Sequence, residues 1–222
     1  MIDAALLPLQ RRLLAPPGRF LAARGVRADQ ITLAGCVIGL AAAGAAALGL
    51  YGLALLGLII NRLADGLDGA VARISGPTDR GAFLDIALDF VFYAAFPLGF
   101  VLADPGANAL AGAVLIASFI LSGTSFLAFA TVAAKRGMVA PAYPSKGIHY
   151  LGGLTEGAET VAFFALFCLF PQTFPVLALI FAAACTVTGV TRLIAGWQSF
   201  GREPVSTQTA GGKTQVFPDE NR

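Results

Sequence analysis

Four aspartates in strongly apolar surroundings are the residues of this chain best suited to chemistry. An ionised carboxylate inside a membrane costs several kcal/mol unless it is paired or bound to a metal, so such residues indicate a functional site. Four of them together would repel one another unless divalent cations intervened, and clustered carboxylate oxygens suit Mg²⁺ or Mn²⁺ better than zinc. The four residues are Asp65, Asp68, Asp85 and Asp89.

The spacing of these aspartates predicts two pairs, each on one face of a helix. Asp65 and Asp68 are at positions i and i+3, and Asp85 and Asp89 are at positions i and i+4. Because the connection between them is short, we expect two antiparallel neighbouring helices whose acidic faces meet near their cytoplasmic ends. Two ions about 4 Å apart could then clamp a diphosphate during a displacement reaction. The pattern therefore predicts a phosphoryl-type transfer.

The composition indicates that the helices carrying these residues lie in a membrane. Of 222 residues, 57% are hydrophobic and 13% are charged, and the mean hydropathy is +0.76, which excludes an ordinary soluble domain. Apolar stretches of nearly bilayer length predict an all-α polytopic membrane protein with six transmembrane helices. The expected spans are 31–50, 53–72, 83–102, 111–134, 148–170 and 174–198.

The lysines and arginines outside the expected spans predict the orientation of the protein. They gather before the first span, between the second and third, between the fourth and fifth, and after the last. The other three connections contain neither residue type. Under the positive-inside rule, both termini and the acidic site face the cytoplasm, at the inner (plasma) membrane if the protein is bacterial.

The two ends of the chain differ from the expected spans. Leucines alternate with arginines before the first span, which predicts either an N-terminal interfacial helix broken at Pro16 and Pro17 or a basic orienting arm. We expect no cleavable signal peptide there. We predict one membrane domain over residues 1–200, followed by a disordered cytoplasmic tail over residues 201–222.

The aspartates also belong to a longer pattern that resembles the signature of the CDP-alcohol phosphatidyltransferase family, D-x2-D-G-x2-A-R-x8-G-x3-D-x3-D. The one departure is a gap of seven residues, 74–80, where the common form has eight. Members of that family are similar six-helix proteins with a juxtamembrane N-terminal helix, and they are often homodimers. The matching residues are, in order, Asp65, Asp68, Gly69, Ala72, Arg73, Gly81, Asp85 and Asp89.

The resemblance implies a reaction in which an alcohol attacks the β-phosphorus of a CDP-linked donor and releases CMP, in phospholipid biosynthesis. The four aspartates would hold two divalent ions, Mg²⁺ or Mn²⁺, and Asp89 would also be the general base. For Thr78, helix N-capping is an equally good interpretation. The residues implied to contact the donor nucleotide are Asp29, Gln30, Ile31, Thr32, Gly69, Ala72, Arg73 and Thr78.

A second polar set lies outside the signature, around the last two spans: Lys135, Lys146, Glu156, Glu159 and Arg192. These residues would either bind the acceptor or form a buried ion pair between Arg192 and a glutamate. If the basic residues meet the aspartates, a phosphorylated alcohol such as glycerol phosphate or inositol phosphate is expected. If the glutamates dominate, an amino alcohol such as serine, ethanolamine or choline is favoured.

Two other functions share some of these features. An aspartate-rich, magnesium-dependent prenyltransferase would have a longer chain and would not explain Gly69, Ala72 and Arg73. A metal or ion transporter would have broken, repeated helices that meet near the middle of the bilayer. The sequence favours the phosphatidyltransferase, with a CDP-linked lipid, a small alcohol, membrane lipids and a second copy of the chain as partners. We expect no nucleic-acid partner.

Overall fold

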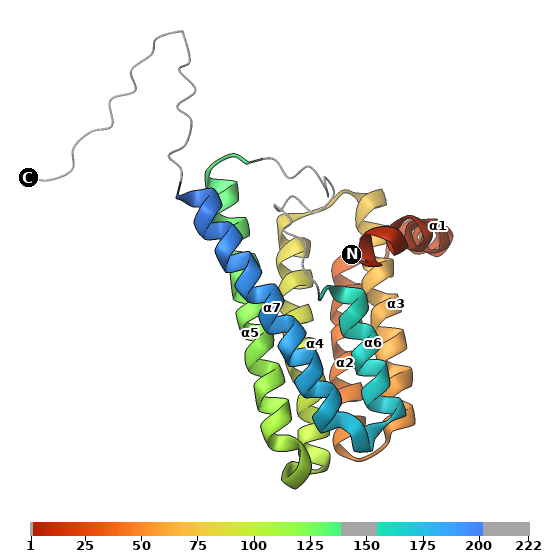
Figure 1. Cartoon of the computed structure of the whole chain (residues 1–222). Coiled ribbons are helices and arrows are strands. Elements are labelled where there is room, and N and C mark those ends of the chain that lie inside the picture. The colour runs from red at the N-terminus through yellow and green to blue at the C-terminus, as the bar shows by residue number, and fades with distance from the viewer. Residues whose placement is uncertain (1, 139–154, 202–222) are drawn as a thin grey trace, which may run out of the picture.

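The computed structural model describes residues 2–138 and 155–201, and their regular secondary structure is entirely helical (Figure 1). The all-α membrane fold predicted from the sequence is confirmed. All residues of the predicted tail, 201–222, after Gly201 lie outside the described residues, and so does part of the fifth predicted span. The helices are α1 (Ile2–Ala23), α2 (Ala28–Ala47), α3 (Tyr51–Ser75), α4 (Asp79–Ala103), α5 (Pro105–Lys135), α6 (Gly157–Leu169) and α7 (Phe174–Phe200).

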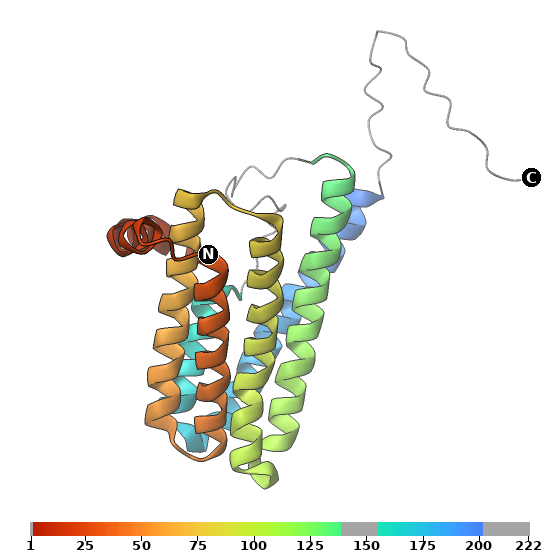
Figure 2. The ribbon, with the colours of Figure 1, turned by 180° about the vertical axis from the view of Figure 1, so that it is seen from behind.

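Helices α2 to α7 run side by side as a bundle, and α1 lies across one end of it (Figures 1 and 2). By length and composition, α2, α4, α5 and the stretch 171–200 are each able to cross a membrane. Helix α3 has 25 residues but carries the charged residues of the site, and the described part of the fifth span, α6, has 13 residues. The bundle therefore combines one helix that carries charged residues with apolar helices able to cross a membrane.

Two glycines form the tight reversals between α2, α3 and α4, and α2 packs against both of the other helices. Gly49, with a φ of 73°, separates α2 from α3, and Gly76, with a φ of 92°, separates α3 from α4. This left-handed region is costly for residues with a Cβ. Pro77 follows, and the hydroxyl oxygen of Thr78 then accepts a hydrogen bond from the Gly81 N–H at 3.0 Å, which caps α4. The seven-residue gap in the signature is thus a short turn that brings the two acidic segments together.

An aromatic core fills the bundle farther from α1 than the acidic residues. Phe96 of α4 stacks on Phe164 of α6, with ring centroids 4.8 Å apart. Phe100 stacks on Phe174 of α7 at 5.1 Å. Beside this core the backbones of α2 and α4 approach closely, since a Cβ on Gly99 would lie 2.3 Å from the Ala43 carbonyl oxygen. Such contacts between small residues hold membrane helices together.

The N-terminal helix is continuous, so the predicted break at Pro16 and Pro17 is wrong. Both prolines lie inside α1 and are exposed. Their missing N–H donors leave carbonyls on the outer side of the helix, where solvent can satisfy them. The inner side packs on α3, with Gly18 against Ala70 and Leu14 against Gly66. Contact with α3 therefore holds α1 together where local propensity alone would interrupt it.

Candidate active site

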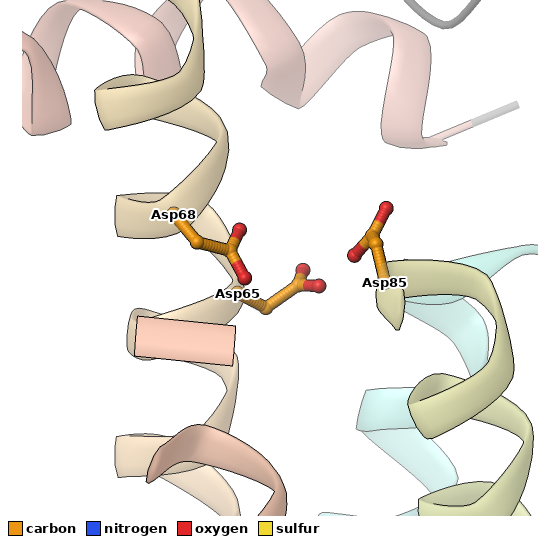
Figure 3. A group of neighbouring side chains, drawn as sticks. All are labelled: Asp65, Asp68 and Asp85. Carbon is orange, nitrogen blue, oxygen red and sulfur yellow. The ribbon is translucent and has the colours of Figure 1, made fainter. Parts of the chain in front are cut away.

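Three aspartates from two helices meet at the end of the bundle nearest α1. Figure 3 shows Asp65 and Asp68 on α3, with Asp85 of α4 directed at them. One carboxylate oxygen from each lies within 4.8 Å of the others. Asp68 is buried, and the other two are partly buried. We call Asp65, Asp68 and Asp85 the aspartate cluster.

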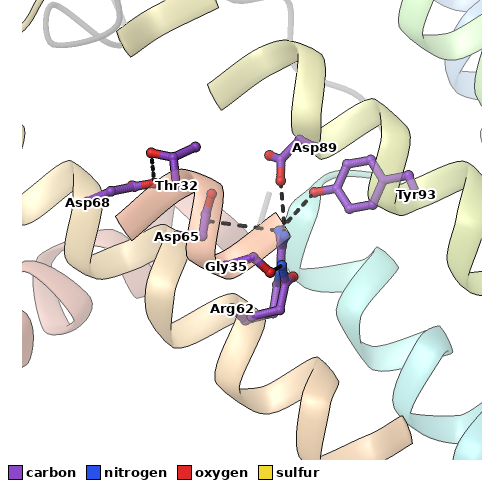
Figure 4. A network of polar contacts seen from close by, with 8 residues as sticks. Thr32, Gly35, Arg62, Asp65, Asp68, Asp89 and Tyr93 are labelled. Atoms are coloured by element: carbon purple, nitrogen blue, oxygen red, sulfur yellow. Dashed lines mark hydrogen bonds and ion pairs between the residues drawn. The ribbon is translucent and has the colours of Figure 1, made fainter. Parts of the chain in front are cut away.

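A threonine from α2 fixes the orientation of the most buried of these carboxylates. The Thr32 hydroxyl donates a 2.6 Å hydrogen bond to Asp68 Oδ2, as Figure 4 shows. The same oxygen of Thr32 lies 3.1 Å from the Ala28 carbonyl in the preceding turn. Thr32 was predicted as a donor contact, and the structure places it beside the acidic residues as well.

The fourth aspartate, Asp89, stands apart from the aspartate cluster because an arginine holds it. Arg62 Nη2 donates to Asp89 Oδ1 at 3.0 Å, and Arg62 Nη1 lies 4.0 Å from Asp65 Oδ2. Arg62 also donates from Nε to Asn61 at 2.8 Å and from Nη1 to the Tyr93 hydroxyl at 3.3 Å (Figure 4). The site thus combines four carboxylates with one guanidinium that pairs with two of them, Asp89 and Asp65.

Arg62 was not predicted from the sequence as a site residue, although a signal for it was present. Arg62 interrupts an apolar stretch one helical turn before Asp65. An arginine within a membrane helix usually faces the bundle interior and finds a counter-ion. The i, i+3 spacing alone would have predicted its pairing with Asp65. Only the tertiary structure, in which α2 packs against both α3 and α4, shows that its shorter contact is with Asp89.

The donor set of the aspartate cluster fits a hard divalent cation. All of its offered ligands are carboxylate oxygens, which suit Mg²⁺ and Mn²⁺, and no histidine or cysteine joins the cluster among the described residues. A pocket bordered by the aspartate cluster, Asp89, Arg62 and Thr32 leads to this position. The arrangement can hold a cation beside a bound phosphate, with an additional carboxylate close by.

The residues predicted to contact the donor nucleotide lie around the same end of the bundle. Asp29 accepts a hydrogen bond from Arg80, which ties the start of α2 to the start of α4. Gln30 accepts a 2.9 Å hydrogen bond from the Arg27 N–H, so its side chain caps α2. Ile31 is partly buried on the first turn of α2. Thr78 is the N-cap of α4, as its alternative interpretation predicted.

The remaining three predicted donor residues follow Asp68 along α3. Gly69 and Ala72 are partly buried, and Arg73 is exposed in the last turn. A Cβ on Gly69 would lie 3.4 Å from Nη1 of Arg73, so this glycine leaves open the space beside the guanidinium. This surface is suited to a bulky anion.

The residues predicted to bind the acceptor occupy several elements. Glu156 and Glu159 form a capping box at the start of α6, in which the Glu156 N–H donates to Glu159 Oε2 at 3.1 Å. Arg192 of α7 is buried and contacts α5, since Nη1 lies 3.2 Å from Ser122 Oγ. Lys135 is exposed in the last turn of α5. Lys146 lies outside the described residues.

Comparison with known proteins identifies the family behind this geometry. The model of the CDP-alcohol phosphatidyltransferase family matches residues 26–191, which contain the whole site. The chain belongs to this family. The match disfavours the prenyltransferase and transporter alternatives, and the enzyme class inferred from the signature is confirmed.

A curated relative and two solved structures are similar to this phosphatidyltransferase. Inner membrane protein YnjF of Escherichia coli (strain K12) is 50% identical over 197 residues, which cover 89% of this chain and 96% of YnjF. Phosphatidylinositol phosphate synthase PgsA1 of Mycobacterium tuberculosis, with CDP-DAG bound, has a TM-score of 0.66 and 21% identity, covering 92% of this chain and all of PgsA1. A structure of PgsA1 with manganese and citrate has a TM-score of 0.62 and 22% identity, covering 83% of this chain and 88% of that one. At these identities, the two structures show a shared fold.

If the aspartate cluster holds a divalent cation, removing one of its charges will weaken that binding. We expect Asp85→Asn to lower the affinity of the purified protein for Mn²⁺ by about tenfold or more. Removal of a residue that only orients a metal ligand lowers metal affinity by about tenfold or more, and removal of a ligand should lower it at least as much. Electron paramagnetic resonance of free Mn²⁺ during a titration measures this affinity. Asp79→Asn is the matched control, because Asp79 is exposed on the first turn of the same helix. Equal Mn²⁺ affinity in the two variants would contradict the assignment.

Proposed function

We propose that this enzyme moves a phosphatidyl group from CDP-diacylglycerol to an alcohol acceptor and releases CMP, as a step of phospholipid biosynthesis. The observation that carries the proposal is the convergence of Asp65, Asp68 and Asp85 from antiparallel helices within the family signature. The binding of CDP-DAG by the similar fold of PgsA1 supports a lipid as the donor rather than the acceptor.

In the proposed reaction, the acceptor oxygen forms a bond with the β-phosphorus of the donor. The bond from that phosphorus to the bridging oxygen breaks, and CMP departs with the electron pair. Asp89 takes the hydroxyl proton, which requires hydrogen-bond reach between its carboxylate and the acceptor. Asp65, Asp68, Asp85 and Asp89 would hold two divalent ions, Mg²⁺ or Mn²⁺, which supply charge neutralisation at the diphosphate.

The starts of α2 and α4 and the end of α3 form the proposed nucleotide side of the site. The contact between Arg80 and Asp29 joins two of these elements, and Arg73 supplies an exposed guanidinium suited to a phosphate. The open space beside Gly69 would admit the nucleotide close to the backbone of α3. In this proposal Asp29, Gln30, Ile31, Thr32, Gly69, Ala72, Arg73 and Thr78 surround the donor.

The contacts around α6 favour a phosphorylated alcohol as the acceptor. Glu156 and Glu159 direct their side chains to backbone N–H groups at the start of α6, which reduces their capacity to bind an amine. The basic residues Lys135, Lys146 and Arg192 would then attract the phosphate of glycerol phosphate or inositol phosphate. Serine, ethanolamine and choline are the alternatives under this proposal.

The reaction is tested with purified protein, Mg²⁺, radiolabelled CDP-diacylglycerol and separate acceptors. We expect CMP release that depends on one phosphorylated alcohol, because the basic residues favour an anionic acceptor. Glycerol phosphate, inositol phosphate, serine, ethanolamine and choline form the panel, and chromatography of the lipid product identifies the one used. Activity with a prenyl diphosphate, together with inactivity of every CDP-linked donor, would contradict the proposal.

The proposed role of Asp89 as base separates catalysis from donor binding. We expect Asp89→Asn to lower kcat by at least about 100-fold, because an amide cannot accept the proton. Binding of CDP-diacylglycerol, measured by equilibrium dialysis, should persist, since the aspartate cluster is intact. Asp79→Asn again serves as the control. If Asp89→Asn lost donor binding as fully as turnover, Asp89 would be a donor-binding residue and not the base.

We also propose that the protein lies in the inner membrane with both termini and the site in the cytoplasm. The clustering of lysine and arginine supports this orientation, and the similarity to an inner membrane protein supports the location. A protease should remove a C-terminal tag from inverted membrane vesicles and not from right-side-out vesicles, and the opposite pattern would contradict the proposed orientation. The family resemblance also favours a homodimer, a state that light scattering of the purified protein would measure.

A further inference from the structure

Arg62 is a largely buried cation whose place in the reaction the family signature does not specify. Its side chain is 16% exposed, and it lies between a member of the aspartate cluster, Asp65, and the proposed base, Asp89. The distance from Arg62 Nη2 to Asp89 Oδ1 is 3.0 Å, whereas the distance from Arg62 Nη1 to Asp65 Oδ2 is 4.0 Å. The guanidinium therefore neutralises Asp89 more directly than it neutralises the aspartate cluster.

Neighbours on three helices hold Arg62 in this position. Asn61 accepts its Nε–H at 2.8 Å and itself donates to the Gly35 carbonyl of α2 at 2.8 Å. The guanidinium also lies over the Phe92 ring of α4, 4.9 Å from the centroid, and contacts the Tyr93 hydroxyl. Several contacts would be lost if Arg62 moved away, so the packing of the bundle holds its guanidinium beside Asp89.

This arrangement makes the surroundings of two incoming cations unequal. A first cation at the aspartate cluster would meet three carboxylates whose oxygens already lie within 4.8 Å of one another. A second cation that used Asp89 would meet a carboxylate with one oxygen already bound to a guanidinium. It would also be repelled by that positive charge at short range, in surroundings that screen charge poorly.

We propose that Arg62 keeps the second cation site weak until the donor arrives. The diphosphate of the donor adds the negative charge that offsets Arg62 and allows the second cation to bind. Arg62 is then a positioning residue that acts through Asp89. This inference rests on the proposed two-ion phosphatidyl transfer.

The wild-type protein provides the first test, in a Mn²⁺ titration followed by electron paramagnetic resonance. We expect one tightly bound Mn²⁺ without donor, and a second tight ion only after CDP-diacylglycerol is added, with no acceptor present. Two equally tight ions without donor would overturn the inference and leave the proposed function intact. If no Mn²⁺ bound under either condition, the metal site of the proposed function would fail, and the inference with it.

Substitution of Arg62 provides the second test. We expect Arg62→Gln to raise the affinity of the donor-free protein for the second Mn²⁺ by about tenfold, within the range known for residues around metal ligands. A purely structural role for Arg62 would predict loss of metal binding instead. Arg62→Lys, which keeps the charge, should stay close to wild type.

A double variant shows whether Arg62 acts through Asp89. In a protein that already carries Asp89→Asn, Arg62→Gln should change the affinity for the second Mn²⁺ much less than in the wild-type protein. The reason is that Arg62→Gln acts by freeing the Asp89 carboxylate, which is absent from the double variant. An undiminished effect in the double variant would overturn the inference, as would overlapping titrations of wild type and Arg62→Gln. Thermal midpoints of all variants report folding, and if Arg62→Gln does not fold, the wild-type and Arg62→Lys titrations decide the question.

Discussion

The structure depends on the burial of five charges within a bundle of apolar helices. Four carboxylates and one guanidinium lie together where water is scarce, and each is expensive unless another charge lies close to it. Arg62 partly offsets this cost by pairing with Asp89 and approaching Asp65. The remaining negative charge of the aspartate cluster suits a divalent cation.

The rest of the fold holds these charges at a fixed separation. The turns at Gly49 and Gly76 reverse the chain tightly, and α2 packs against both α3 and α4. On the far side of the site, the aromatic core joins α4 to α6 and α7, with stacked pairs such as Phe96 and Phe164. Helix α1 closes one end by packing on α3 next to the acidic segment. A rigid apolar frame thus supports a compact polar site.

The site also shows how a family signature acquires local features. Thr32 and Arg62 are not among the fixed residues of the signature, yet they contact Asp68 and Asp89 directly. Each donates a hydrogen bond to one carboxylate oxygen and so orients that carboxylate. Differences between related enzymes in metal affinity and acceptor choice can therefore arise from residues around an unchanged set of aspartates.

The sequence by itself determined the helical membrane fold and the pairing of the aspartates on helical faces, because periodicity and spacing are local properties. The enzyme class followed from the resemblance of the signature to that of a known family. It also placed the turn between the acidic helices. It did not predict the continuity of α1 through Pro16 and Pro17, which depends on packing against α3. Nor did it show that Arg62 pairs most closely with Asp89, or that Glu156 and Glu159 cap α6. Those choices depend on which side chains from distant segments meet, and only the tertiary structure decides that.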